Sequence, residues 1–303
     1  MTVQSSQRAG NTVLLGIGLM LAAVLVFSSN NALGKWTIGT IPVGEFLFLR
    51  GLLALVLLSP FYCREGLAPI RAAPRKGLQL ARMLLSSIEI AMFYWALSYL
   101  PLADTMTFWL ATPIYVTALS ALLLGEKVGW RRWTAVTVGF FGVVLAMRPS
   151  GATFGWPALI GVTGSILYAF VLIATRSLRS TSDIVLVSGS LAGSTIFGLV
   201  MMSFGFFVMP SAIDLGVITV IAILFIVGAV LSNRSLRLAP ASVVVPFQYT
   251  QIIWGVLFGY LVFGDVPAIT TLVGAAIITG AGIYIFMRER AVSKREPMPI
   301  EPP

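Results

Sequence analysis

The chain has 303 residues, of which 58% are hydrophobic and only 10% are charged, and its formal net charge is +9. Soluble domains carry about 25% charged residues, so this composition cannot supply the polar exterior of a soluble protein. The lack of histidine excludes a Ser-His-Asp triad and histidine-bound zinc or haem, and the single cysteine, Cys63, excludes an internal disulfide and a multi-cysteine metal site. We therefore expect no cofactor.

Ten apolar blocks follow one another along the chain, each of about the 17–25 residues that a helix needs to cross a bilayer core. In chain order they cover residues 12–33, 43–62, 78–99, 104–124, 132–147, 156–175, 184–208, 213–235, 242–263 and 268–287. Helices are expected because lipid offers no partner to an unpaired backbone group. The sequence predicts an all-α polytopic membrane protein with ten transmembrane helices.

The basic residues are distributed unevenly between the predicted loops. If both termini are cytoplasmic, 17 of the 20 Lys and Arg residues lie on the cytoplasmic side, two lie outside (Lys35 and Arg148), and Arg50 lies within a span. This asymmetry follows the positive-inside rule and predicts a multi-pass protein of a bacterial-type inner membrane. The positive charge is thus a topology signal and does not indicate a nucleic-acid partner. Residues 1–11 and 289–303 are predicted to be cytoplasmic, the latter as a disordered tail.

Part of the chain repeats at a constant offset of 139 residues. The segment 96–128 matches 235–267, with Pro101 on Pro240 and Gly125-Glu126 on Gly264-Asp265. The unit contains five spans, an odd number, so the second copy enters the membrane from the opposite side. We predict two inverted five-helix repeats, 12–147 and 148–288. This construction is common among secondary transporters, whose substrate site lies near the midplane between the halves.

The run SYLPLADTMTFWLATPIYVTALSALLLGEKVGWRRW, with Pro113 thirteen residues before Glu126, is the most specific stretch. It resembles the EamA-type carriers of the drug/metabolite transporter superfamily, and the resemblance covers residues 12–288. Such carriers export amino acids and other metabolites or take up compounds such as riboflavin and S-adenosylmethionine. The chain departs from them where FSSN (27–30) replaces W-G-x-N and where Ile252 stands in place of a second-half proline.

The fourth and ninth spans carry the candidate binding site. Trp109 and Thr112 map by the repeat offset onto Gln248 and Gln251, and the three-residue spacing puts each pair on one helix face. Pro113 should kink the fourth span and free a carbonyl, which is tolerated where a cavity satisfies the backbone. We predict a wet cavity at the midplane. The alternatives are hydrogen bonding between helices for the glutamines and interfacial anchoring for the tryptophan.

Two ionisable residues, Arg50 and Glu89, fall inside predicted spans. A charge at the bilayer centre costs about 2.5–3.5 kcal/mol on insertion scales, so such residues usually face the bundle interior. We expect either an Arg50–Glu89 pair or a Glu89 that carries a coupling proton, with a purely structural ion pair as the alternative. Tyr94 is a candidate for planar substrates. Asn30 is a candidate for substrate contact or for a helix cap at the end of the first span.

These features favour a secondary transporter with a small-molecule substrate, the lipid bilayer as its surroundings and protons as a candidate coupling ion. The chain has no P-loop for ATP hydrolysis. The family resemblance implies export of amino acids or related metabolites, by alternating access. Uptake of a vitamin or nucleoside-like compound is the second reading. An intramembrane enzyme using Glu89 or Asp104 is the third, although Asp104 fits a helix N-cap better. The oligomeric state stays open.

Overall fold

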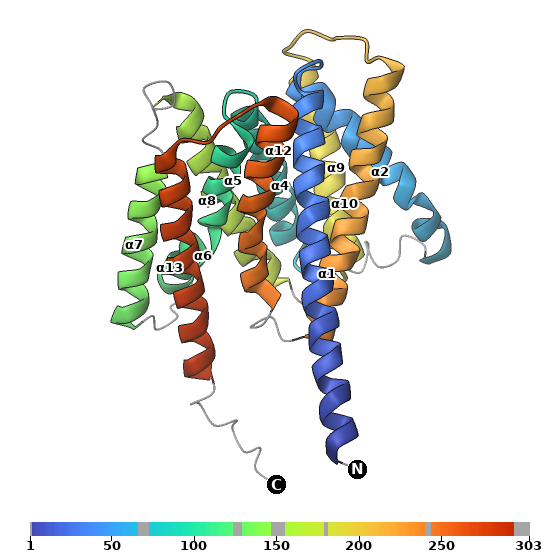
Figure 1. The fold of residues 1–303 in the computed structure, drawn as a ribbon. Helices are drawn as coiled ribbons and strands as arrows, with labels where there is room; N and C mark the ends of the chain where they lie inside the picture. Colours follow the sequence, from blue (N-terminus) through green and yellow to red (C-terminus); the bar gives the residue numbers. More distant parts are fainter. Residues whose placement is uncertain are drawn as a thin grey trace.

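A computed structural model describes residues 2–65, 73–123, 129–146, 155–178, 181–239 and 244–293. These residues form helices and turns without any strand, and the start of α1 and the end of α13 lie at the same end of the bundle (Figure 1). Seven of the described helices are long and apolar enough to cross a membrane. They are α1 (Thr2–Thr37), α2 (Val43–Glu65), α4 (Lys76–Leu97), α8 (Trp156–Ser177), α9 (Asp183–Met202), α10 (Ala212–Leu238) and α13 (Ile269–Ser293).

The remaining three predicted spans correspond to one shorter helix and two interrupted ones. The shorter helix is α7 (Trp130–Ala146), and the fourth span is divided into α5 (Leu102–Leu110) and α6 (Thr112–Leu123). The ninth span begins as the 3-10 helix η1 (Val245–Thr250) and continues as α12 (Gln251–Phe263). The prediction of an all-α polytopic membrane protein is confirmed.

Several predicted ends are wrong. The seventh span was expected to reach residue 208, but α9 ends at Met202. The amides of Ser203, Phe204 and Gly205 donate to carbonyls three residues earlier, which tightens and ends the helix while the apolar sequence continues. The predicted tail from residue 289 is helical as far as Ser293. Residues 294–303, Glu126 and the boundary between the predicted repeats at 147–148 lie outside the described residues.

The two interruptions occupy equivalent positions of the repeat. After each one the α-helix resumes, at Thr112 in the first half and at Gln251 in the second, and these residues are separated by the repeat offset. The predicted kink at Pro113 is therefore a complete break. Pro113 lies in the first turn of α6, where the missing backbone N–H leaves no helical hydrogen bond unmade.

The most extensive contacts between helices recur between the equivalent helices when the two halves are interchanged. The long contact between α1 and α10 has its counterpart between α8 and α4, and the contact between α4 and α9 has its counterpart between α10 and α2. The pairs α2–α9 and α7–α13 are their own counterparts. This pattern is what two structurally related halves are expected to produce.

The helices α5 and α12 pack directly against each other. Gly255 and Gly259 are buried, and a Cβ atom added to Gly255 would lie 2.7 Å from the Met106 sulfur. At Gly259 the packing is looser, since an added Cβ atom would be in ordinary contact with the Cβ atoms of Asp265 and Leu102, at 3.8 and 3.9 Å. The G-x-x-x-G spacing therefore provides a close-packing surface, as transmembrane helices commonly use it.

Candidate functional site

A polar cluster lies inside the bundle between α2, α4 and α5. Arg50, Glu89 and Tyr94 are 5%, 6% and 0% exposed, although the first two would be charged in water. Tyr94 packs edge-on against Phe46 and Phe93, with ring centroids 4.6 and 5.1 Å apart. Its hydroxyl has no hydrogen-bond partner among the described residues. The cluster thus combines two buried ionisable groups with aromatic walls.

The guanidinium of Arg50 lies between two aromatic rings. Its Cζ atom is 5.7 Å from the centroid of Tyr94 and 5.0 Å from that of Phe225 on α10. Within the described part of the chain, Nε is buried without a hydrogen-bond partner and no ion pair reaches the side chain. Aromatic faces offset part of the cost of burying this cation. The planar N–H donors of arginine are suited to a bidentate anion, and no anion of the protein occupies them here.

Glu89 bonds to Trp109 instead of Arg50. The indole Nε1 of Trp109 donates to Glu89 Oε1 over 2.8 Å, which ties α5 to α4. The Trp109 ring also meets Phe93 edge-on at 4.8 Å and stays partly exposed. The direct Arg50–Glu89 ion pair, one of the two sequence-based alternatives, is not formed among the described residues in this conformation.

Thr112 and Pro113 shape the break in the fourth span. The Thr112 hydroxyl donates to the Trp109 carbonyl, and the Thr117 hydroxyl donates to the Pro113 carbonyl over 2.9 Å. The Trp109 carbonyl, whose helical donor would be the missing Pro113 N–H, thereby gains a partner, while the Thr117 bond is an ordinary hydroxyl bond to the carbonyl four residues earlier. Thr112 is buried. Its hydroxyl hydrogen is used in the bond to the Trp109 carbonyl.

The two glutamines lie apart from this cluster. Gln248 is exposed on η1, at the end of the ninth span nearer the termini, and Gln251 is half-buried at the start of α12. The Gln248 amide nitrogen is 4.0 Å from the sulfur of Met20 on α1. No hydrogen bond joins either glutamine to Trp109 or Thr112 in the described ranges. The structure brings Arg50, Glu89, Tyr94 and Trp109 together but does not place the glutamines with them.

Two capping predictions are wrong. Asn30 does not end its helix, since α1 continues to Thr37, and its amide donates to the Ile221 carbonyl of α10 over 2.7 Å. It is buried and ties α1 to α10. The N-cap of α5 is Pro101, three residues before Asp104. The Asp104 carboxylate is buried, and its Oδ1 has no hydrogen-bond partner among the described residues.

An ion pair that sequence reasoning missed joins the two halves at the end opposite the termini. Lys35 Nζ, near the end of α1, lies 2.7 Å from Asp265 Oδ2, just after α12, and also donates to the Leu100 carbonyl over 3.1 Å. The same nitrogen is 4.8 Å from the Phe263 ring centroid. We call this contact the Lys35–Asp265 bridge. It is the only ion pair among the described residues.

The backbone geometry just after α12 determines where Asp265, the acid of the Lys35–Asp265 bridge, lies. Gly264 follows α12 in the left-handed conformation with φ +68°, which glycine adopts without a Cβ penalty. The amides of Gly264 and Asp265 then donate to the carbonyls of Tyr260 and Gly259, each over 3.0 Å. This closes the helix end and turns the aspartate towards α1. The repeated Gly-acid pair was the available sequence signal, but its partner lies 230 residues away.

Comparisons with known proteins agree with this architecture. The EamA-like transporter family matches residues 14–148. A riboflavin transporter of Vibrio cholerae is 30% identical over 288 residues, covering 91% of this chain and 94% of its own. A pseudopaline exporter of Pseudomonas aeruginosa is 27% identical, with 89% and 95% covered. An S-adenosylmethionine uptake transporter of Rickettsia bellii is 24% identical, with 94% and 98% covered.

The fold is shared with a solved crystal structure that is only 17% identical. That structure superposes with a TM-score of 0.63 and covers 91% of this chain and 98% of its own. A score of this size over nearly the whole length shows a common helical arrangement. Together with the full-length relatives, it leaves one conclusion: the chain belongs to the EamA-like transporter family of the drug/metabolite transporter superfamily.

Proposed function

We propose that this transporter exports small metabolites that carry a carboxylate, foremost amino acids and related compounds, across the inner membrane by alternating access. The observation that carries the proposal is Arg50, a buried guanidinium that lies near two aromatic rings and forms no ion pair with a carboxylate among the described residues. An unpaired buried charge is costly to a membrane protein. A substrate carboxylate that pairs with Arg50 would offset this cost.

The neighbours of Arg50 fit an amino acid. A carboxylate accepts two parallel N–H bonds from a guanidinium. Glu89 offers a second, negative group for the substrate's ammonium, or a site for a coupling proton. Phe93, Tyr94 and Trp109 supply apolar walls for a side chain. One basic and one acidic side chain in the same cluster therefore favour a zwitterionic ligand, while the export direction rests on the family resemblance alone.

Alternating access is supported by the difference between the two ends of the bundle. The end opposite the termini is closed by the Lys35–Asp265 bridge and by the tight packing of Gly255 on Met106. At the other end, Gln248 is exposed on η1. With both termini cytoplasmic, as the positive-inside rule predicts, this conformation is closed towards the outside. Transport then requires the bridge to break when the other state forms.

Uptake of a larger metabolite is a second candidate. The relatives include a riboflavin transporter and an S-adenosylmethionine uptake transporter. The edge-to-face array of Phe93 and Trp109 favours it, because such rings accept a planar heterocycle. S-adenosylmethionine also carries a free amino acid end, so Arg50 would serve both candidates in the same way.

Counterflow in liposomes loaded with purified protein tests these proposals. The panel consists of free amino acids, the same compounds as carboxamides, S-adenosylmethionine and riboflavin. We expect saturable exchange of compounds with a free carboxylate and little exchange of their amides. Equal exchange of acids and amides would rule out carboxylate recognition. Exchange of riboflavin alone would replace the first candidate with the second.

The bridge itself gives a second expected result. Lys35→Ala should speed the labelling of Met106→Cys by an impermeant maleimide from outside, in a Cys63→Ser background, by about 1.5- to 5-fold. This range corresponds to the ~0.2–1 kcal/mol that a partly exposed ion pair contributes. The charge-exchanged double variant, Lys35→Asp with Asp265→Lys, should restore slow labelling. If the double variant labels as fast as the single one, the charge pair does not hold this end closed.

A further inference from the structure

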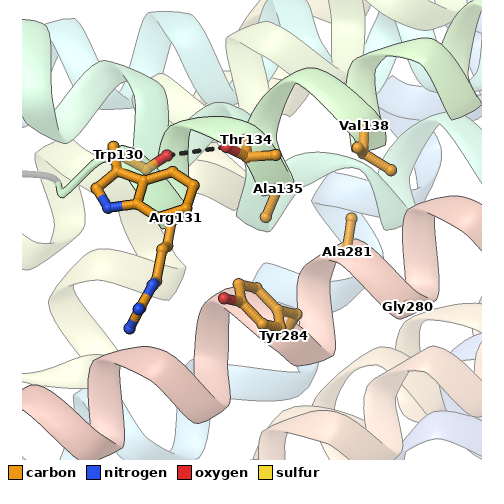
Figure 2. Close-up of a pocket in the computed structure, with 8 residues that line it drawn as sticks. All are labelled: Trp130, Arg131, Thr134, Ala135, Val138, Gly280, Ala281 and Tyr284. Carbon is orange, nitrogen blue, oxygen red and sulfur yellow. Dashed lines mark hydrogen bonds between the residues drawn. The ribbon is translucent and has the colours of Figure 1, made fainter.

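A groove on the side of the bundle lies between α7 and α13, apart from the polar cluster around Arg50. Figure 2 shows side chains of both helices lining it, with Trp130 and Arg131 at the start of α7 and Tyr284 on α13. Its volume is about 370 Å³. None of the described residues that line the groove has a role in the proposed transport cycle.

The groove begins at the start of α7 and runs along this helix towards its middle. Tyr284 lies in the part of α13 that leads towards the C-terminus, so this rim is at the end of the bundle that carries both termini (Figure 1). From Arg131 to Val138, which also lines the groove, the distance along α7 is about 10 Å at 1.5 Å per residue. This depth is about a third of the ~30 Å hydrocarbon core.

The rim presents a cation and two amphipathic rings. The Arg131 guanidinium is exposed and lies 5.4 Å from the Trp130 ring centroid, and no ion pair engages it in the described chain. Trp130 and Tyr284 are 73% and 45% exposed, as is usual for rings at the headgroup level. The Thr134 hydroxyl already donates to the Trp130 carbonyl over 3.1 Å (Figure 2). Arg131 is thus the one ionic group of the lining.

The floor of the groove is formed by small residues. Ala135 faces Gly280 and Ala281, and a Cβ atom added to Gly280 would meet nothing within 4 Å. Elsewhere the same two helices touch closely, since a Cβ on Gly274 would lie 2.7 Å from the Gly142 carbonyl. The space at Gly280 is therefore a local opening in an otherwise tight helix pair. Its apolar floor suits a hydrocarbon chain.

We propose that this groove binds an anionic phospholipid of the leaflet nearer the termini. The headgroup phosphate binds Arg131, Trp130 and Tyr284 flank the glycerol region, and one acyl chain lies over Ala135 and Gly280. Basic pockets between transmembrane helices on the cytoplasmic side recognise acidic headgroups. A second copy of the chain fits less well, because a two-fold contact places the same patch on both subunits. Arg131 would then face its own equivalent.

Lipid retention by the purified full-length protein tests the proposal. The protein is exchanged into detergent with equal amounts of phosphatidylglycerol and phosphatidylcholine, and co-purifying lipid is quantified by mass spectrometry. The wild-type protein should retain phosphatidylglycerol in preference. Arg131→Gln should lower that preference about fivefold, as expected for one basic residue near an acidic surface. Gly280→Leu should fill the open floor and reduce retention of both lipids.

Matched variants separate the groove from general effects. Lys76→Gln removes an exposed charge at the start of α4, and Gly18→Leu fills open space on α1, where a Cβ likewise meets nothing within 4 Å. Both should retain lipid as the wild-type protein does. The proposal fails if Arg131→Gln keeps the full preference or if Gly18→Leu loses lipid equally. It also fails if inorganic phosphate displaces all of the bound phosphatidylglycerol. A dimer that light scattering detects and that only Gly280→Leu dissociates would likewise contradict it.

Discussion

Replacing Arg50 with glutamine should weaken the apparent affinity for carboxylate substrates by about 10-fold to 150-fold. This range corresponds to the ~1.5–3 kcal/mol that a hydrogen bond to a charged group contributes. Arg50→Lys keeps the charge but loses the planar pair of donors, so its loss should be intermediate. The measurement is the concentration dependence of counterflow in liposomes for an amino acid and for its carboxamide.

The comparison between acid and amide distinguishes recognition from a structural role. If Arg50 binds the carboxylate, the glutamine variant should lose most of the preference for the acid, because the amide never made that contact. A variant that weakens both substrates by the same factor would contradict the assignment. Thermal unfolding of the same samples shows whether the fold survives, since the removed cation is buried between Tyr94 and Phe225.

Replacing Glu89 with glutamine should abolish uptake driven by a pH gradient while leaving counterflow largely intact. The amide oxygen can still accept the Trp109 indole hydrogen bond of 2.8 Å, but the side chain can no longer carry a proton or a charge. Transport is measured in liposomes at two pH values, with and without a gradient. Unchanged gradient-driven transport would remove Glu89 from the coupling mechanism.

Glu45 provides a matched control for this substitution. It is also buried, at 1% exposure, and its Oε2 accepts the Val208 backbone amide over 3.1 Å. It lies in the first turn of α2, five residues before Arg50, and forms no ion pair with Arg50 among the described residues. Glu45→Gln should therefore leave the pH dependence of transport unchanged. If both variants lose gradient-driven transport equally, the loss comes from replacing a buried acid with glutamine and not from a coupling role of Glu89.

Helix positions were accessible from the sequence because lipid imposes simple constraints on length and polarity. Pro113 was enough to predict an irregular fourth span. Hydropathy failed at the end of α9 because residues 203–208 are apolar without being helical. Composition does not distinguish a helix from an apolar loop.

The pairing of polar side chains was harder to predict, since it depends on which helix faces which. Glu89 accepts a hydrogen bond from Trp109, 20 residues away, and Lys35 pairs with Asp265, 230 residues away. The repeat offset makes Gln248 the equivalent of Trp109, but the two residues have equivalent surroundings only if the two halves adopt the same conformation. Here the first half has α-helix before its break and the second has a 3-10 helix, so equivalent residues face different neighbours.

The breaks at Thr112 and Gln251 have a mechanical consequence. An unbroken helix transmits a tilt from one membrane surface to the other, whereas an interrupted helix can bend at a hinge. Because Gly255 and Met106 hold α12 against α5, these two segments can rock as one rigid lever. A change in the tilt of α6 or η1, the segments beyond the hinges, then has to be matched by α8 or α1, on which they pack, while α5 and α12 keep their mutual contact.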